Sequence, residues 1–306
     1  MAVYVNTNVS SLNGRRHLNN VQNSLNSTYQ RLSSGMRINS AKDDAAGLQI
    51  ADRLTTQING LNQGNRNTND GIALAQTIEG GMDEMAGMLQ KIRTLAVQSA
   101  NGTNTAEDRK AITKEVQSLQ DEITRIAKQT KFGGKTVLMG GKTADSIYTV
   151  DATNGDKGGK LTLQVGANKD DEITFSVSNF VFSVMLTRAT GQAGNAITNG
   201  WVDGNKKLTV STADHAKAVI ELMDKMIADV DTQRSGLGAI QNRLESSIRN
   251  QSNVAANQAD ARSRIRDADF AEESAALSQQ SIIQQAATSM LMQANSRPQL
   301  ALSMLG

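Results

Sequence analysis

The side chains that could do chemistry in this chain are few and lie far apart. Two of its 306 residues are histidine, His17 and His215, and none is cysteine. No acidic or nucleophilic constellation accompanies either histidine, as general acid–base or triad chemistry would need. A lone histidine on a helix surface or at a helix cap is the simpler interpretation. Without cysteine the chain has no disulfide, no thiolate metal ligand and no thiol nucleophile.

The sequence Gly-Gly-Lys-Thr occurs twice, at 133–136 and at 140–143. It resembles the end of a phosphate-binding loop, in which backbone N–H groups and a lysine hold phosphates. That loop needs an earlier glycine, and Gln129 and Thr136 stand at the required positions instead. We therefore interpret both copies as turns.

Two acidic clusters and the overall charge also fail to indicate a ligand. Residues 43–44 and 170–172 lack the spacing of a calcium loop, so we interpret them as a helix cap and a solvated loop. The net charge is +2 without a block of like charge, which argues against a nucleic-acid surface. The longest apolar run, 180–186, is far shorter than the roughly 20 residues of a membrane span. The sequence predicts no enzyme, no cofactor, no metal site, and neither a nucleic-acid nor a membrane partner.

The elements that the apolar residues define are long helices. Proline occurs once, at 298, and aromatic residues make up only 3% of the chain, which suits narrow helical seams better than a globular core. Apolar residues recur three and four apart over about 44–100, 105–132 and 211–265, the last seam becoming polar beyond Leu244. The first two of these stripes are Ala51, Leu54, Ile58, Leu61, Asn65, Thr68, Ile72, Ala75, Ile78, Met82, Met85, Leu89, Ile92 and Ala96, and Ile112, Val116, Leu119, Ile123 and Ile126.

Both ends of the chain carry the same helical spacing. A helix from Val9 to about Leu32, ending near Gly35, presents one stripe, and a helix in the last thirty residues presents the other. The stripes are Leu18, Val21, Leu25, Thr28 and Leu32, and Ala276, Ile283, Ala287, Met290 and Ala294. Each is suited to another helix. Because termini usually fray, we expect the two to pair and to gain order from partners.

The middle of the chain has a different character. Alternating runs at 161–165 and 173–177, separated by glycine clusters, predict strands in hairpins. We place 141–204 on the exterior and expect 145–172 to be dispensable. The run 180–186 is too apolar for water and should pack on the bundle or on an adjacent subunit. The fold class is mainly α: a long coiled-coil-like helical bundle with a β-hairpin-rich central insertion and paired N- and C-terminal helices.

Two segments resemble the signatures of a known family. Leu32–Arg53, LSSGMRINSAKDDAAGLQIADR, is similar to the N-terminal signature of bacterial flagellin, and Ser263–Glu273, SRIRDADFAEE, is similar to its C-terminal counterpart. The ending with Gln293–Asn295 and Pro298 is also similar. The resemblance covers about 1–140 and 210–306. It implies a structural subunit that self-assembles into the extracellular flagellar filament for swimming motility.

The family layout implies three parts. Residues 1–43 with 267–306 would form an inner terminal coiled-coil domain, and 44–140 with 205–266 a helical bundle domain. Residues 141–204 would be a variable β-rich surface insertion, without large outer domains. The subunit would be exported through the flagellar type III apparatus without a cleaved signal peptide. Its partners would be other copies of itself, an export chaperone, and the filament cap and hook-associated proteins.

The resemblance and the stripes together give candidate site residues. For self-assembly they are Leu18, Val21, Leu25, Leu32, Arg37, Ile283, Ala287, Met290 and Leu291. Lys91, Leu95 and Glu115 match the patch that Toll-like receptor 5 of hosts recognises in flagellins, with Lys91 where sensed members usually have arginine. Thr143, Ser146, Ser176 and Ser178 are candidate O-glycosylation sites, although ordinary strand-surface hydroxyls are the simpler interpretation.

Two alternatives stay open at this point. One is the hook–filament junction protein, a hook-associated relative of the same family that forms no filament. The other is an enzymatic flagellin with a protease insertion, which would need His-Glu-x-x-His in the middle of the chain. The middle contains no histidine, and the nearly complete N-terminal signature favours flagellin.

Overall fold

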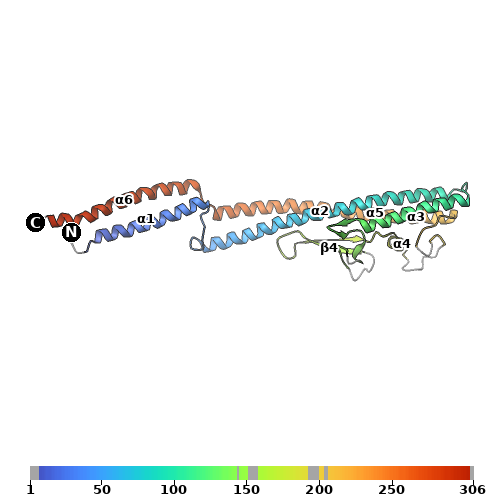
Figure 1. Cartoon of the computed structure of the whole chain (residues 1–306), viewed down its shortest axis with the longest axis horizontal. Helices are drawn as coiled ribbons and strands as arrows, with labels where there is room; N and C mark the ends of the chain where they lie inside the picture. Colours follow the sequence, from blue (N-terminus) through green and yellow to red (C-terminus); the bar gives the residue numbers. More distant parts are fainter. Residues whose placement is uncertain (1–6, 143–144, 151–157, 192–199, 203–205, 304–306) are drawn as a thin grey trace. The chain divides into compact units, whose positions relative to one another are not determined.

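The computed structural model describes residues 7–142, 145–150, 158–191, 200–202 and 206–303. Over these residues the protein is mainly α, with small antiparallel sheets (Figure 1), as the sequence predicted. The helices are α1 (Val9–Ser34), α2 (Ala45–Ala100), α3 (Ala106–Gln129), α4 (Phe182–Thr190), α5 (Ala213–Arg266) and α6 (Phe270–Ser303), with a 3₁₀ turn, η1 (Gly140–Lys142). The strands are β1 (Lys131–Phe132), β2 (Lys135–Thr136), β3 (Thr149–Val150), β4 (Gly158–Gln164) and β5 (Glu172–Ser178).

The chain divides into two compact units. Residues 1–59 with 254–306 form the terminal unit, and residues 60–253 form the central unit. The continuous helices α2 and α5 contribute residues to both units. The three-domain division implied by the resemblance stays a prediction.

Short-range signals set the helix ends. Gly35 ends α1 in the left-handed conformation, with φ of 68°, as its position after Ser34 predicted. The Asp44 carboxylate accepts a hydrogen bond from the Gly47 N–H at 2.9 Å and caps α2. Thr105 and Asp108 form the predicted capping box at the start of α3, each side chain accepting from the other's backbone N–H.

The core of the central unit lies where the stripes of α2, α3 and α5 meet. The predicted α2 stripe is buried throughout its second half, from Ala75 to Ala96. Arg93 on α2 forms an ion pair with Asp224 on α5 at 2.6 Å. Gly81 admits a neighbour to this core, since a Cβ there would lie 2.7 Å from Leu138, which is fully buried.

The polar half of the α5 seam finds its partners on other elements. Beyond Leu244, Gln251 is buried and donates to the Val165 carbonyl at 2.6 Å. Asn65 on α2 donates to the Ser252 hydroxyl at 3.4 Å. Side-chain hydrogen bonds therefore replace apolar contacts along this stretch, as a polar seam packed against another helix requires.

The middle of the chain contains the predicted strands but is not a surface appendage. Strands β4 and β5 pair antiparallel with Leu161 opposite Phe175, and β3 lies on the other edge of β4. Phe175 and Val177 are buried in the same cluster as the helix stripes. Tyr148 is also buried and donates its hydroxyl to the Val137 carbonyl at 2.7 Å. The burial of Tyr148 argues against the expectation that 145–172 is dispensable, which stays a prediction.

The apolar run 180–186 packs on the bundle, as expected, but most of it is helix α4 rather than strand. Phe182, Met185 and Leu186 are buried at helical spacing. Arg188 on α4 forms an ion pair with Asp229 on α5, and its guanidinium lies 5.6 Å from the centre of the Phe180 ring. The strands just before this run alternate with a period of two residues, so the change to helical spacing in the run was not recognised from the sequence. Among the described residues, no helix combines the length and apolar character that crossing a membrane requires.

Phe180 provides a test of this packing, because its side chain is fully buried in the central core. Phe180→Ala should lower the free energy of unfolding by about 3–5 kcal/mol through lost burial and a residual cavity. Chemical denaturation followed by circular dichroism measures the change. Val97→Ala, at a position 49% exposed, is the control and should cost less than about 0.5 kcal/mol. Equal effects of the two substitutions would contradict a core at this position.

Candidate assembly surface

The two ends of the chain pair as antiparallel helices. At one end of the pair the Asn8 amide donates to the Ala294 carbonyl at 2.8 Å, and at the other the Thr28 hydroxyl donates to Gln280 at 3.4 Å. Between them, Gly14 lies against Leu291, whose Cδ1 would be 3.2 Å from a Cβ at the glycine. The predicted pairing of the N- and C-terminal helices is therefore confirmed.

The seam of α1 is the predicted one, whereas the predicted stripe of α6 coincides only in part with the observed seam. Leu18, Val21, Leu25 and Leu32 are half-buried and Thr28 is buried. On α6 the half-buried positions are Glu273, Ala276, Leu277, Gln280, Ser281, Gln284, Ala287, Leu291 and Ala294, so they include Ala276, Ala287 and Ala294 of the predicted stripe. Of the predicted α6 stripe, Ile283 is 42% and Met290 70% exposed. These two residues line one flank of the helix pair rather than its seam.

This flank carries a groove and several exposed apolar side chains. The groove has a volume of about 650 Å³, and its walls are largely small or apolar. It is lined by Ser10, Asn13, Gly14, His17, Val21, Ile283, Ala286, Ala287, Met290, Gln293 and Ala294. Elsewhere on α1 and α6, the exposed large apolar residues are Val9, Leu12, Tyr29, Phe270, Ile282 and Met292. The sequence analysis did not identify these six residues as an exposed apolar surface. Their positions outside the heptad seam were the signal that could have indicated it.

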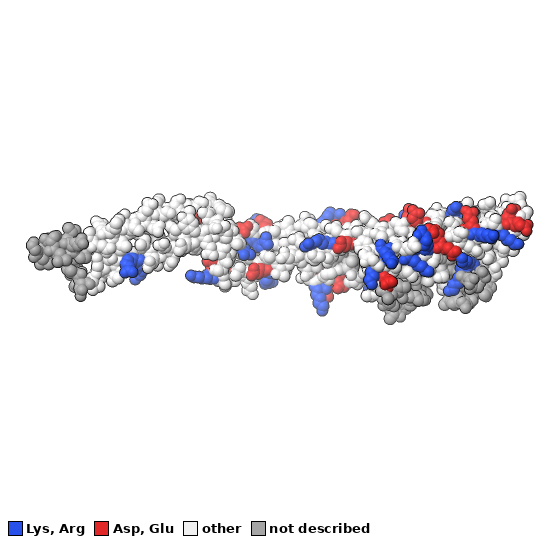
Figure 2. All heavy atoms as spheres, in the orientation of Figure 1, with Lys and Arg blue, Asp and Glu red and all other residues white. Residues whose placement is uncertain are grey.

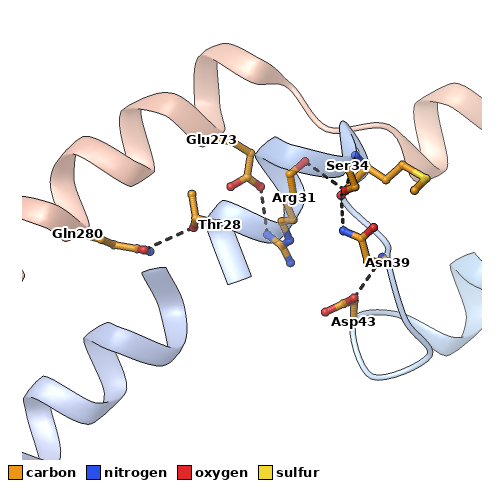
Figure 3. A network of polar contacts seen from close by, with 8 residues as sticks. Thr28, Arg31, Ser34, Asn39, Asp43, Glu273 and Gln280 are labelled. Carbon is orange, nitrogen blue, oxygen red and sulfur yellow. Dashed lines mark hydrogen bonds and ion pairs between the residues drawn. The ribbon is translucent and has the colours of Figure 1, made fainter. Parts of the chain in front are cut away.

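A polar network fixes the end of the pair where α6 begins (Figure 3). Arg31 on α1 forms an ion pair with Glu273 on α6 at 3.2 Å, and the glutamate side chain is only 12% exposed. The Asp43 carboxylate accepts the backbone N–H groups of Asn39 and Ser40, at 3.2 and 2.9 Å. Asn39 in turn donates to the Met36 carbonyl at 2.9 Å. The signature residues thus hold the turn between α1 and α2 in one conformation.

Arg37 has a role within the chain itself. Its backbone N–H donates to the Arg266 carbonyl at 2.7 Å, and its guanidinium donates to the Ile265 carbonyl at 2.7 Å. These are the last carbonyls of α5, which have no acceptor role inside the helix. Arg37 therefore caps α5 in the structure, and its predicted part in self-assembly remains a prediction.

The structure brings together two of the three residues of the predicted receptor patch. Lys91 on α2 and Glu115 on α3 form an ion pair at 3.2 Å with both side chains exposed. The Leu95 side chain is only 8% exposed and belongs to the central core. The pair is accessible on the surface, whereas Leu95 mainly supports the helix packing beneath it.

The candidate glycosylation sites differ in accessibility. The Ser146 hydroxyl donates to the Gly140 carbonyl at 2.6 Å and accepts the Tyr148 N–H at 3.2 Å, so it is engaged in the fold. Ser176 on β5 is exposed and Ser178 is half-buried. Thr143 lies outside the described residues.

The residues whose side chains could take part in a reaction form no reactive cluster in the described part of the chain. There, no three His, Cys, Asp or Glu side chains come close enough to hold a metal ion. His215 lies at the start of α5, where its backbone N–H donates to the Thr212 hydroxyl at 3.2 Å. His17 lines the groove. A second hollow of about 780 Å³ lies beside β4 and β5, and its described lining includes Arg188 but no histidine or carboxylate.

The fold and this surface define a class of protein: an α-helical subunit with paired, incompletely buried termini and no described catalytic centre. Comparisons with known proteins agree. Residues 5–143 match the model of the bacterial flagellin N-terminal helical region, and residues 220–305 match that of the C-terminal helical region.

Curated relatives match over the whole chain. It is 37% identical to Flagellin D of Vibrio anguillarum over 383 aligned residues, and 35% identical to Flagellin B of Vibrio cholerae over 377, with 100% of both chains covered in each case. A solved structure described as a flagellar hook-associated protein of Vibrio parahaemolyticus is 17% identical, with a TM-score of 0.56 over 74% of this chain and 100% of that one. That last likeness shows the fold alone. The chain belongs to the bacterial flagellin family.

The Asp43 turn yields a pH test. Hydrogen bonds from the Ser40 N–H and hydroxyl and from the Asn39 N–H hold the pKa of Asp43 below its usual value. The stabilisation is present above the unfolded pKa and is lost as the pH falls through the lower, folded pKa. We expect the amide resonances of Asn39 and Ser40 to titrate with a midpoint below about 3.9, the value of an unperturbed aspartate. Asp43→Asn should abolish the titration, and a midpoint at or above that value would contradict the assignment.

Proposed function

We propose that this protein is the structural subunit of a bacterial flagellar filament and that it self-assembles into this helical polymer for swimming motility. Its family consists of structural proteins, and the chain matches curated relatives named flagellin over their full length. The observation that carries the proposal for this chain is the apolar surface left uncovered on α1 and α6.

The uncovered side chains are large. Ile282, Met290 and Met292 are 67%, 70% and 68% exposed, and they lie within eleven residues of one another on α6. Fully burying one such side chain contributes roughly 1.5–3 kcal/mol. Several large exposed apolar side chains on one helix, beside a groove with largely small or apolar walls, are typical of a site of protein association. Between identical subunits, a contact of one face with a different face of the next copy produces an open filament when the rotation between copies does not close into a ring.

We propose an extracellular location in the flagellum, reached by export through the flagellar type III apparatus. The absence of cysteine suits a chain that crosses between compartments, because no disulfide has to form or break. The weakly buried α1–α6 pair suits export in an unfolded state, since little packing must be undone there.

The other partners are proposals from the family. They are an export chaperone, the filament cap and hook-associated proteins, and Toll-like receptor 5 of hosts. For the receptor, the exposed Lys91–Glu115 ion pair is the accessible feature. Lysine in place of arginine removes bidentate donor geometry, so we expect recognition that is retained but weakened. For O-glycosylation, Ser176 is the exposed hydroxyl of β5.

Electron microscopy of the purified full chain, after seeding or salting out, tests the proposed function. Long filaments of uniform diameter are the expected result. A hook-associated protein of the same family would give no such polymer, so discrete particles alone would overturn the filament assignment. The non-enzymatic character proposed here rests on the family and on the lack of a reactive cluster in the described residues.

A substitution at Ile283 distinguishes an effect on assembly from an effect on folding. Its side chain is 42% exposed at the groove, so Ile283→Asp should leave the monomer folded. In a filament the same carboxylate would be buried without a partner at every subunit contact, at a cost of several kcal/mol each. We expect sedimentable polymer to disappear while the circular dichroism spectrum of the monomer is unchanged.

Ile283→Met is the matched control, because it keeps an apolar side chain of similar volume at the groove and should assemble. Leu291→Asp should also block assembly, but by disrupting the seam against Gly14. Normal filaments from Ile283→Asp would remove this flank of α6 from the assembly surface.

A further inference from the structure

Methionine is the only sulfur-containing residue type in this protein. The chain has 12 methionines and no cysteine. A two-electron oxidant converts the thioether of methionine into a sulfoxide, which turns a flexible apolar side chain into a polar one. Because the chain has no thiol, no cysteine competes with the methionines for such an oxidant.

The described methionines differ sharply in accessibility. Those at most 1% exposed all belong to the central core, namely Met82, Met85, Met185, Met223 and Met226. Met36, Met88 and Met139 are half-buried, and Met1 and Met304 lie outside the described residues. The exposed methionines of the described chain are Met290 (70%) and Met292 (68%), both on α6. An oxidant in solution reaches these two side chains directly, whereas the core methionines react only when the central unit opens.

The two exposed methionines lie on either side of the seam between α1 and α6. Leu291, which stands between them in the sequence, points at Gly14 of α1, since its Cδ1 would be 3.2 Å from a Cβ there. Successive residues of an α-helix are about 100° apart around its axis, so Met290 and Met292 flank Leu291 on opposite sides. Met290 lines the groove of about 650 Å³, and Met292 therefore lies on the other flank.

The surface around both residues is uncharged. Residues 274–296 contain no charged side chain. Figure 2 shows the terminal helices as almost entirely uncharged on the face in view, apart from one basic patch. The walls of the groove are largely small or apolar. A sulfoxide oxygen accepts hydrogen bonds, and its burial against such a surface without a donor is unfavourable. Oxidation of either methionine therefore opposes any contact that buries its flank of the helix pair.

We propose that Met290 and Met292 are modification sites, oxidised in the unassembled subunit by oxidants of the peroxide class, and that their sulfoxides prevent assembly while the central core stays folded. In each reaction a lone pair of the sulfur bonds to one oxygen of hydrogen peroxide and the O–O bond breaks. The other oxygen leaves as water with both protons. The sulfur is oxidised by two electrons and the peroxide is reduced by two. The effect on assembly rests on the proposed function, whereas the sites themselves can be tested without filaments.

Peptide mass spectrometry of the full chain, after brief exposure to dilute hydrogen peroxide, tests the sites. Fragmentation of the peptides locates each added oxygen. Met290 and Met292 should be oxidised at least about tenfold faster than the methionines of the central core, which react only through opening of the fold. The circular dichroism spectrum should stay unchanged over the same time. Equal rates for the exposed and the core methionines would overturn the assignment of the sites.

The critical concentration for assembly tests the consequence. Oxidation of both residues should raise it about tenfold, because each buried sulfoxide lacks a donor in the contact. Treatment with the methionine sulfoxide reductases for both sulfoxide epimers, with dithiothreitol as reductant, should restore it to within a few-fold of the untreated value. In that step the sulfoxide oxygen leaves as water and the dithiol becomes a disulfide. A subunit that assembles normally with both residues oxidised, or that stays impaired after both sulfoxides are removed, would overturn the proposal.

Leucine variants show which methionines are responsible, since leucine has a similar volume and no sulfur to oxidise. Each variant is compared with its own untreated critical concentration. Met290→Leu with Met292→Leu should be insensitive to peroxide, whereas Met36→Leu, at a half-buried position of the same unit, should remain as sensitive as the parent chain. If the double variant assembles poorly, the reductase treatment of the parent chain decides the question.

The outcomes separate this proposal from the proposed function. A double leucine variant as sensitive to peroxide as the parent chain would overturn the proposal and leave the filament function standing. Failure of the untreated parent chain to form filaments would overturn the filament function and, with it, the effect on assembly. The peptide measurement would still test the two oxidation sites.

Discussion

The incomplete burial of the α1–α6 pair is the constraint on which the rest of the structure depends. Thr28 is the only buried residue of α1, and none of the described side chains of α6 is buried. Small and polar residues such as Gly14, Gln284 and Ala287 fill much of the seam, so the two helices approach closely but exclude little apolar surface from water. Helices in folded proteins gain most of their stability from the packing of one apolar face, and isolated helices are marginal in water. Here a single copy supplies only part of that packing, and neighbouring copies can supply the remainder.

The central unit stands in contrast, because it completes its own core. Residues of α2, α3, α4, α5 and β5 contribute to one buried cluster, and the polar stretch of α5 gains hydrogen bonds such as that from the Gln251 amide N–H to the Val165 carbonyl. Buried polar groups with partners cost little, whereas unpaired ones are expensive. Stability in the monomer should therefore reside in the central unit, while the terminal unit keeps the surfaces that assembly can use.

Much of this organisation could be predicted from the sequence, and the failures have physical causes. Helix ends at Gly35 and Thr105 follow from local backbone chemistry, and the α2 stripe follows from large apolar residues at regular spacing. On α6, Ile283 and Met290 were wrongly placed in the seam because alanine and glutamine fit several heptad phases, and only contacts such as Gly14 with Leu291 select one. Helix α4 was missed because a short apolar run has no reliable period of its own. The groove depends on how two distant segments pair, which no local pattern encodes.

Amide hydrogen exchange of the purified chain, as monomer and as filament, tests the central claim most directly. In the monomer, the amides of α1 and α6 should exchange with little protection, while those of Ile78 to Ala96 in α2 should be strongly protected, as local burial predicts. In the filament, both regions should be protected. Equal protection of α1, α6 and the central core in the monomer would show that the terminal pair is stable by itself, and would contradict the account.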